Sequence, residues 1–212
     1  AAPEWLEQWE KYSLRCGKSG DGLTGFTEAG IAREIAANLP EGSTLFVSSS
    51  RPIRDLEGFA APRAGVTTHA NRGLAGIDGN ISTALGIACA SKQTFAVLGD
   101  LSFLHDLTGL IHREEINCAF IVINNDGGGI FSTLPQRGVD GFESVFGTPH
   151  GLDPAAIAAA MGISASTISS VDELKKILKA PVKGVSITVA NVPSRDENAD
   201  SLKAIYESMN SI

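Results

Sequence analysis

Two apolar segments of the chain lead into residues that could together bind a divalent cation. The segment "VLGDLSFLHDLTGL" carries Asp100 directly after its apolar start, and "VINNDGGGIFSTLP" carries Asn125 shortly before three glycines. Mg²⁺ prefers oxygen ligands, commonly a carboxylate, amide or carbonyl oxygens and the phosphates of a substrate. Asp100 lies 25 residues before Asn125, the length of one helix plus one strand, so adjacent parallel strands would bring the two together. We therefore predict a cation site formed by Asp100, the Asn125 side chain and the backbone carbonyl of Gly127.

Each motif taken alone is typical of an ordinary turn. Gly-Asp at the end of a strand usually caps a helix, and a run of Asn, Asp and Gly usually forms a loop. Their spacing favours a joint site, and so does the position of Asp100 at the expected start of a helix. Exposed N–H groups there attract anions such as phosphate, with which a bare carboxylate would compete. A divalent cation resolves this conflict because it binds both groups.

The segments around these motifs alternate between strand and helix patterns. Continuous apolar runs are expected of strands covered on both faces, and apolar residues three and four apart indicate one face of a helix. We expect strands at 43–50, 64–70, 94–99, 118–124 and 184–190, helices at 3–15, 27–39, 77–88, 104–111, 154–161, 171–179 and 197–210, and a loop at 136–150. The alternation predicts an α/β fold with a doubly wound, mostly parallel sheet and helices on both faces.

The same pattern suggests where a ligand would bind. In a doubly wound sheet, ligands lie beyond the carboxyl ends of the strands, where the polar loops at 48–54, 71–79, 99–105 and 124–134 would meet. The stretch "GKSGDGLTG" is typical of a linker or turn. We therefore divide the chain into a lead-in helix with a linker, residues 1–24, and a domain that carries the site, residues 25–212.

Composition argues against several classes of protein. The net charge is −7 without a basic cluster, so we expect no nucleic-acid binding through a charged patch. No apolar run reaches membrane-spanning length, and no signal peptide is visible. The three cysteines lack C-x-x-C spacing, which argues against a zinc site or a disulfide framework and favours the cytoplasm. Because the chain begins with Ala1 rather than Met, we expect it to be part of a longer protein.

Three longer stretches resemble a family of thiamine diphosphate enzymes. They are "ANRGLAGIDGNISTALG", "GDLSFLHDLTGL" and "NNDGGGIFSTLPQ". Gly-Asp followed at this distance by Asn-Asn resembles the cofactor fingerprint of such enzymes in general. The full wording is similar to the 2-succinyl-5-enolpyruvyl-6-hydroxy-3-cyclohexene-1-carboxylate synthase (MenD) family of menaquinone synthesis. The resemblance is strong over residues 46–136, and it implies the family's C-terminal, diphosphate-binding domain with the end of the preceding linker.

This resemblance implies three groups of site residues. The first would hold Mg²⁺ or Mn²⁺. The second would bind the diphosphate, hold the cofactor in its bent shape and form an apolar wall. The third would bind substrate carboxylates. The groups are Asp100, Asn125 and Gly127; Ile77, Gly99, Leu101, Ser102, Ile130, Phe131 and Leu134; and Ser50, Arg54 and Arg72. Judged by residue type alone, the two arginines suit carboxylates but could equally belong to a solvated surface. The apolar residues 130, 131 and 134 could equally be core.

The resemblance also implies a reaction and its partners. The family is a transferase that decarboxylates 2-oxoglutarate and adds the resulting succinyl carbanion equivalent to isochorismate. Its activating glutamate lies in an N-terminal pyrimidine-binding domain, usually of a partner subunit, for which this chain has no room. We therefore expect a homo-oligomer, and no activity from this chain alone.

Two alternatives stay open. The first is another thiamine diphosphate enzyme of 2-oxoacids, such as an acetolactate synthase relative, although the wording "GDLSFLHD" speaks against it. The second is a non-catalytic nucleotide-binding module on the same fold. The absence of G-x-G-x-x-G after the first expected strand weakens that reading.

Overall fold

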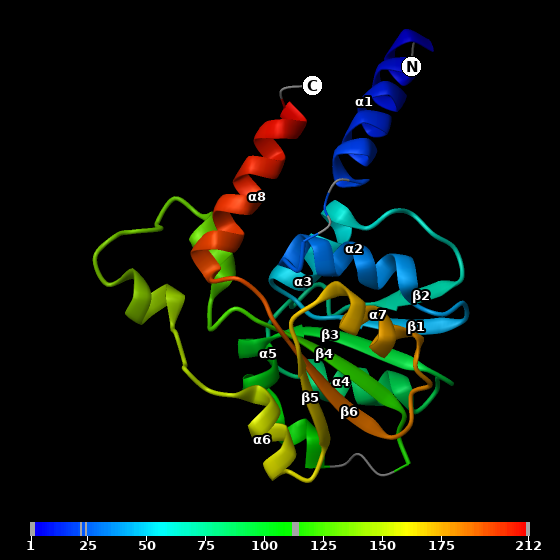
Figure 1. Cartoon of the computed structure of the whole chain (residues 1–212), viewed down its shortest axis with the longest axis vertical. Coiled ribbons are helices and arrows are strands. Elements are labelled where there is room, and N and C mark those ends of the chain that lie inside the picture. The colour runs from blue at the N-terminus through cyan, green and yellow to red at the C-terminus, as the bar shows by residue number, and fades with distance from the viewer. Residues whose placement is uncertain (1–2, 22, 24, 112–114, 211–212) are drawn as a thin grey trace.

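The computed structural model describes residues 3–21, 23, 25–111 and 115–210. Six strands in these ranges form one sheet, in which every neighbouring pair is parallel (Figure 1). The order across the sheet is β2-β1-β3-β4-β6-β5. The strands are β1 (Ser43–Val47), β2 (Val66–His69), β3 (Thr94–Gly99), β4 (Cys118–Asn124), β5 (Ser164–Ile168) and β6 (Val185–Asn191). The carboxyl ends of all six strands therefore lie along one edge of the sheet.

Helices cover both faces of this sheet. On one face, Phe120 of β4 belongs to a core cluster with Ile81 and Phe103. On the other, Ile121 belongs to a cluster with Ile31 and further apolar residues. The covering helices are α4 (Asn80–Ala88), α5 (Asp100–His105) and α6 (Pro154–Ala160) on the first face, and α2 (Glu28–Asn38) and α7 (Val171–Lys179) on the second. Successive side chains of a strand point to opposite faces, so β4 must be apolar throughout. The predicted doubly wound α/β fold is confirmed.

The remaining elements are α1 (Pro3–Asp21), α3 (Arg51–Phe59), α8 (Arg195–Asn210), the 3₁₀ turns η1 (Leu107–Ile111) and η2 (Gly129–Thr133), and the π-helical turn η3 (Glu143–Gly147). Ile53 and Leu56 of α3 pack against the second cluster, and the buried Leu110 of η1 belongs to the first. Figure 1 shows α1 and α8 projecting beyond the sheet on the same side.

Two elements were not expected from the sequence. Helix α3 follows β1 directly, and its start is marked by Pro52 in the first turn, a position that suits proline because no N–H is needed there. Strand β5 pairs only with β6 at the edge of the sheet. Three of its five residues are exposed, so it lacks the apolar run that reveals a buried strand.

Several expected boundaries were wrong. The strand expected at 43–50 ends at Val47, and the helix expected at 77–88 begins at Asn80 after the left-handed Gly79. The lead-in helix continues through two glycines to Asp21, and Gly20 is buried, with Arg33 of α2 close to it. The helix expected at 104–111 begins at Asp100 and is interrupted at Asp106, whose side chain accepts hydrogen bonds from Ser82. The loop expected at 136–150 contains η3. The division of the chain at residue 25 stays a prediction.

Candidate functional site

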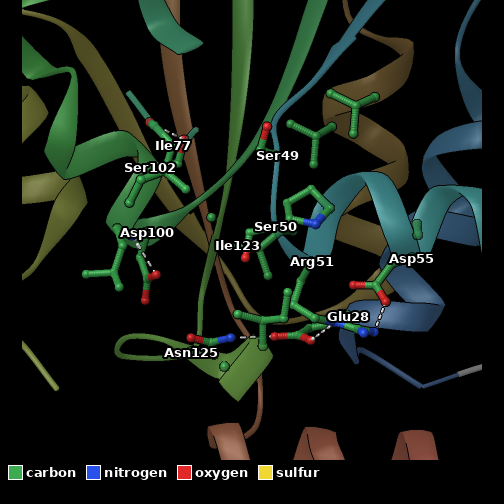
Figure 2. Close-up of a pocket in the computed structure, with 18 of the residues that line it drawn as sticks. Glu28, Ser49, Ser50, Arg51, Asp55, Ile77, Asp100, Ser102, Ile123 and Asn125 are labelled. Atoms are coloured by element: carbon green, nitrogen blue, oxygen red, sulfur yellow. Dashed lines mark hydrogen bonds and ion pairs between the residues drawn. The ribbon is translucent and has the colours of Figure 1, made fainter. Parts of the chain in front are cut away.

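A pocket of about 280 Å³ opens at the carboxyl edge of the sheet. After β1 the chain passes to β2 on one side, and after β2 it crosses to β3 on the other side of β1. Ligands of doubly wound sheets bind at this kind of switch point. The pocket is lined by ten of the thirteen predicted site residues: Ser50, Ile77, Gly99, Asp100, Leu101, Ser102, Asn125, Gly127, Ile130 and Phe131. The structure therefore brings most of the predicted site together, from loops far apart in the sequence (Figure 2).

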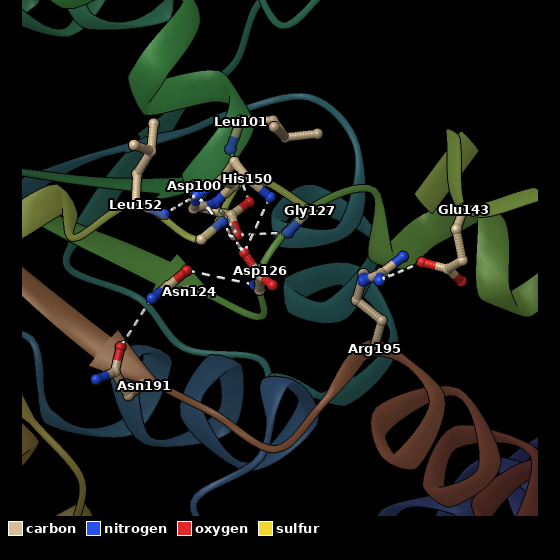
Figure 3. A network of polar contacts seen from close by, with 11 residues as sticks. Asp100, Leu101, Asn124, Asp126, Gly127, Glu143, His150, Leu152, Asn191 and Arg195 are labelled. Atoms are coloured by element: carbon tan, nitrogen blue, oxygen red, sulfur yellow. Dashed lines mark hydrogen bonds and ion pairs between the residues drawn. The ribbon is translucent and has the colours of Figure 1, made fainter. Parts of the chain in front are cut away.

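Asp100 is the one carboxylate among the predicted site residues, and it is deeply buried. It is 2% exposed, and its Oδ1 accepts a hydrogen bond of 2.7 Å from the Leu101 N–H. Its Oδ2 accepts one of 2.9 Å from the Gly127 N–H and lies 3.3 Å from Nε2 of His150 (Figure 3). Burial raises the pKa of Asp100, while these donors act in the opposite direction. A bound cation would favour the ionised carboxylate further.

The two other predicted ligands, Asn125 and Gly127, each have an oxygen atom with an unused lone pair. The Asn125 Oδ1 atom is buried and has no hydrogen-bond partner, which is costly unless a ligand satisfies it. The Gly127 carbonyl accepts one hydrogen bond, from the Gly129 N–H at 3.0 Å, and retains a second lone pair. Across the described ranges, no group of three or more His, Cys, Asp or Glu side chains could hold a metal ion. The oxygen set formed by Asp100, Asn125 and Gly127 fits Mg²⁺ or Mn²⁺.

The backbone around these ligands takes conformations that few residues tolerate. Gly127 has a φ of 131°, and a Cβ atom there would lie 2.2 Å from the carbonyl oxygen of Gly147, so only glycine fits. Ser50, the N-cap residue of α3, has a φ of 77°, which strains a residue with a Cβ. Strain of this kind persists where the surroundings enforce it, often at functional sites.

The predicted apolar contacts lie on two other parts of the pocket wall, near the start of α5 and at η2. The Ser102 hydroxyl donates a 3.1 Å hydrogen bond to the carbonyl oxygen of Ile77 and so ties the "GIDG" loop to the start of α5. Ile130 and Phe131 of η2 are half-buried. The Phe131 ring packs against Phe146 of η3, which holds this wall in place.

Three predicted residues do not line the pocket. Arg54 is exposed and donates a 2.7 Å hydrogen bond to the Ser50 carbonyl. Arg72 is exposed in the loop after β2, and Leu134 is 40% exposed after η2. Their roles in binding substrate and cofactor stay predictions.

Four ionisable residues of the site were not anticipated. The side chains of Glu28, Arg51 and Asp55 line the pocket from α2 and α3, and His150 contacts Asp100. The Nδ1 atom of His150 accepts a 3.0 Å hydrogen bond from the Leu152 N–H, so the neutral ring carries its proton on Nε2, facing Asp100. The spacing of Arg51 and Asp55, which matches an i,i+4 helical pair, could have indicated two of the four.

We expect the stability of the fold to depend on the ionisation of Asp55. Burial raises the pKa of this carboxyl to about 7, although the Arg51 charge lowers it. The folded chain therefore holds this proton more tightly than the unfolded chain, and the free energy of unfolding should fall as pH rises from about 4 to 7. Asp55→Asn should remove a slope of up to about 1.4 kcal/mol per pH unit in this range.

Urea denaturation at pH 5 and at pH 7 measures this difference. Glu28 and Asp100, whose pKa values are also raised, are retained in both proteins, so part of the pH dependence should remain in Asp55→Asn. Asp172→Asn, at an exposed position of α7, serves as the control. An equal pH dependence in Asp55→Asn and the wild type would show that Asp55 does not titrate as proposed.

Comparison with known proteins agrees with this geometry. Residues 56–192 match the family model described as "Thiamine pyrophosphate enzyme, C-terminal TPP binding domain". The chain belongs to this family. Thiamine pyrophosphate, or TPP, is thiamine diphosphate under another name, so the predicted cofactor of this TPP-binding domain is confirmed. The matched range includes the predicted cation ligands.

Curated relatives of this TPP-binding domain are named 2-succinyl-5-enolpyruvyl-6-hydroxy-3-cyclohexene-1-carboxylate synthase. One from Thermobifida fusca is 46% identical over 160 residues, covering 72% of this chain and 29% of the relative. Another, from Bacillus cytotoxicus, is 39% identical over 214 residues, covering 96% of this chain and 36% of the relative. The chain thus spans about a third of the length of these relatives. The resemblance to the C-terminal domain of the MenD family is confirmed.

A solved structure supports the fold. The crystal structure of benzoylformate decarboxylase from Polynucleobacter necessarius superimposes with a TM-score of 0.62 at 19% identity, covering 78% of this chain and 33% of that one. The alternatives of an acetolactate synthase relative and a non-catalytic nucleotide-binding module are not favoured by the relatives of this TPP-binding domain. No helix in the part of the chain described here is long and apolar enough to cross a membrane.

Proposed function

We propose that this chain is the part of a MenD-type synthase that holds the diphosphate of its cofactor through a divalent cation. The observation that supports this most strongly is the buried, unpartnered Oδ1 atom of Asn125 beside Asp100. An oxygen in that position needs a positively polarised partner. The Gly127 carbonyl completes a set of three oxygen ligands.

The residues of the pocket have separate tasks in this proposal. Asp100, Asn125 and Gly127 hold the cation, and the backbone at Gly99–Ser102 faces the diphosphate. Ile77, fixed by Ser102, supports the cofactor from one side, and η2 supplies the apolar wall. Thiamine diphosphate, when bound, supplies the nucleophile and the electron sink for decarboxylation.

We further propose the substrates and partners of the family for the longer protein. The relatives' shared name supports a transferase of menaquinone biosynthesis that acts on 2-oxoglutarate and isochorismate. An N-terminal pyrimidine-binding domain would close the pocket and supply the activating glutamate, in a homo-oligomer. The free cysteines of the described residues suit a cytoplasmic location.

The protein encoded by the complete gene can test this assignment. Release of carbon dioxide is measured with thiamine diphosphate, Mg²⁺ and either 2-oxoglutarate or pyruvate, with and without isochorismate. We expect turnover of 2-oxoglutarate and formation of an adduct with isochorismate. Preference for pyruvate would instead support the acetolactate synthase alternative, and no turnover of either acid would refute the proposed activity.

Removing Arg72 should separate substrate binding from cofactor binding. A charge-assisted contact to a carboxylate is worth about 1.5–3 kcal/mol, which corresponds to a loss of roughly 10- to 150-fold. In the complete protein, Arg72→Ala should lower kcat/KM for 2-oxoglutarate by this factor while the affinity for thiamine diphosphate changes little. The control is Lys92→Ala. Lys92 is exposed just before β3, at the amino ends of the strands and away from the pocket. If both quantities fall equally, or neither falls, Arg72 does not bind substrate; Arg54→Ala can be assayed in the same way.

A further inference from the structure

A row of polar side chains crosses one wall of the pocket, from Asn125 through Glu28 and Arg51 to Asp55 (Figure 2). Asn125 Nδ2 donates a 2.5 Å hydrogen bond to Glu28 Oε1. Glu28 Oε2 lies 3.5 Å from Arg51 Nε, and the other end of the Arg51 guanidinium pairs with Asp55. The three charged side chains are 4–12% exposed. The row therefore joins two helices to a predicted cation ligand.

Glu28 is also held through its backbone. It is the first residue of α2, after the N-cap residue Thr27, and its N–H donates a 3.3 Å hydrogen bond to Asn198 Oδ1. The Asn198 side-chain amide in turn donates a 2.6 Å hydrogen bond to the Pro193 carbonyl. The carboxylate thus extends from a point fixed by α8, and it has little freedom to follow Asn125 if that side chain rotates.

This contact decides which way the Asn125 amide faces. A carboxylate only accepts hydrogen bonds, so the NH₂ group of Asn125 must point toward Glu28 and the oxygen must point away. In Figure 2 the oxygen lies on the side of Asp100 and the nitrogen on the side of Glu28. Rotating the amide by half a turn would place two oxygen atoms against each other and turn a donor toward the cation.

We propose that Glu28 is a positioning residue of the cation site, which fixes the Asn125 amide with its oxygen toward the cation, and that Arg51 holds Glu28 in place. This inference rests on the proposed function, because it assumes a cation at Asp100 and Asn125. Partners behind a metal ligand typically contribute 10- to 100-fold to metal affinity because they orient the ligand. Arg51 and Asp55 can affect Asn125 only through Glu28, since neither has a hydrogen bond or ion pair with Asn125 among the described residues.

The inference is tested by removing the acceptor at position 28. In the 212-residue chain, Glu28→Ala should weaken the binding of Mn²⁺ in the presence of thiamine diphosphate by about 10- to 100-fold, measured by electron paramagnetic resonance. The control is Asp172→Asn, at an exposed position of α7 outside the pocket, which should change this affinity less than about threefold. Urea denaturation shows whether each variant is folded. Glu28→Val removes the acceptor in a second way, if the alanine variant does not fold.

A second readout follows the orientation of the amide without any ligand. The side-chain NH₂ resonances of Asn125, identified by their loss in Asn125→Ala, should move toward the values of solvent-exposed amides in Glu28→Ala and stay in place in Asp172→Asn. Wild-type Mn²⁺ affinity in a folded variant without Glu28 would overturn the positioning role, and so would an equal loss in Asp172→Asn. If the wild-type chain binds no Mn²⁺ with thiamine diphosphate, the cation site itself fails, and the inference fails with it.

Discussion

Replacing Asp100 by alanine should abolish Mg²⁺-dependent binding of thiamine diphosphate by the complete protein while leaving the fold intact. Asp100 is the only predicted cation ligand with a charge, and its two oxygens are already aligned by the N–H groups of Leu101 and Gly127. Loss of residues behind a ligand costs 10- to 100-fold in metal affinity, so loss of the ligand itself should cost at least about 100-fold. Titration calorimetry at fixed Mg²⁺ concentration measures the effect.

Two further variants make this result specific. Asp100→Asn preserves the shape and one acceptor oxygen but removes the charge, so its affinity should also fall strongly while its stability changes less. Asp172→Ala, at an exposed position of α7, should bind as the wild type does. Cofactor affinity within about threefold of the wild type in folded Asp100→Ala would remove Asp100 from the cation site.

The second large effect concerns activity, which we expect to be missing from this chain alone. In the proposed function, the activating glutamate comes from an N-terminal domain, and the chain spans about a third of its relatives' length. The pocket carboxylates offer no replacement. Glu28 and Asp55 are paired with Arg51, and Asp100 is assigned to the cation. Without a covering domain, the pocket also stays open to water, which weakens the electrostatic effects of a closed site.

The assay is decarboxylation of 2-oxoglutarate by the 212-residue chain with excess thiamine diphosphate and Mg²⁺. We expect no turnover above the reaction without protein. The complete protein, assayed under the same conditions, is the positive control. Turnover by the short chain within tenfold of that control would show that no further carboxylate is needed.

The sequence predicted the centre of the site because its elements follow simple rules. The apolar runs of β3 and β4 identify buried strands, and parallel strands place Asp100 and Asn125 at the same edge. The register confirms this arrangement, since Gly99 pairs with Ile123 at the ends of the two strands. Residues that directly follow neighbouring buried strands are therefore predictable from the sequence.

The residues that support this centre could not be predicted in the same way. Glu28 reaches Asn125 across 97 positions of the chain, and His150 reaches Asp100 across 50. Neither pair shares an element or a periodic pattern, so only the packed fold shows the contact. Arg51 could not be predicted for a different reason, because the polar stretch after β1 is typical of a turn although it leads into α3.

The central claim is that this chain binds thiamine diphosphate through a cation, and one calorimetric titration tests it most directly. The 212-residue chain is titrated with thiamine diphosphate in the presence of Mg²⁺ and again with a chelator that removes all divalent cations. The account predicts binding of one cofactor per chain with Mg²⁺ and at least about 100-fold weaker binding without it. Equal affinity in the two titrations, or no binding in either, would contradict the account.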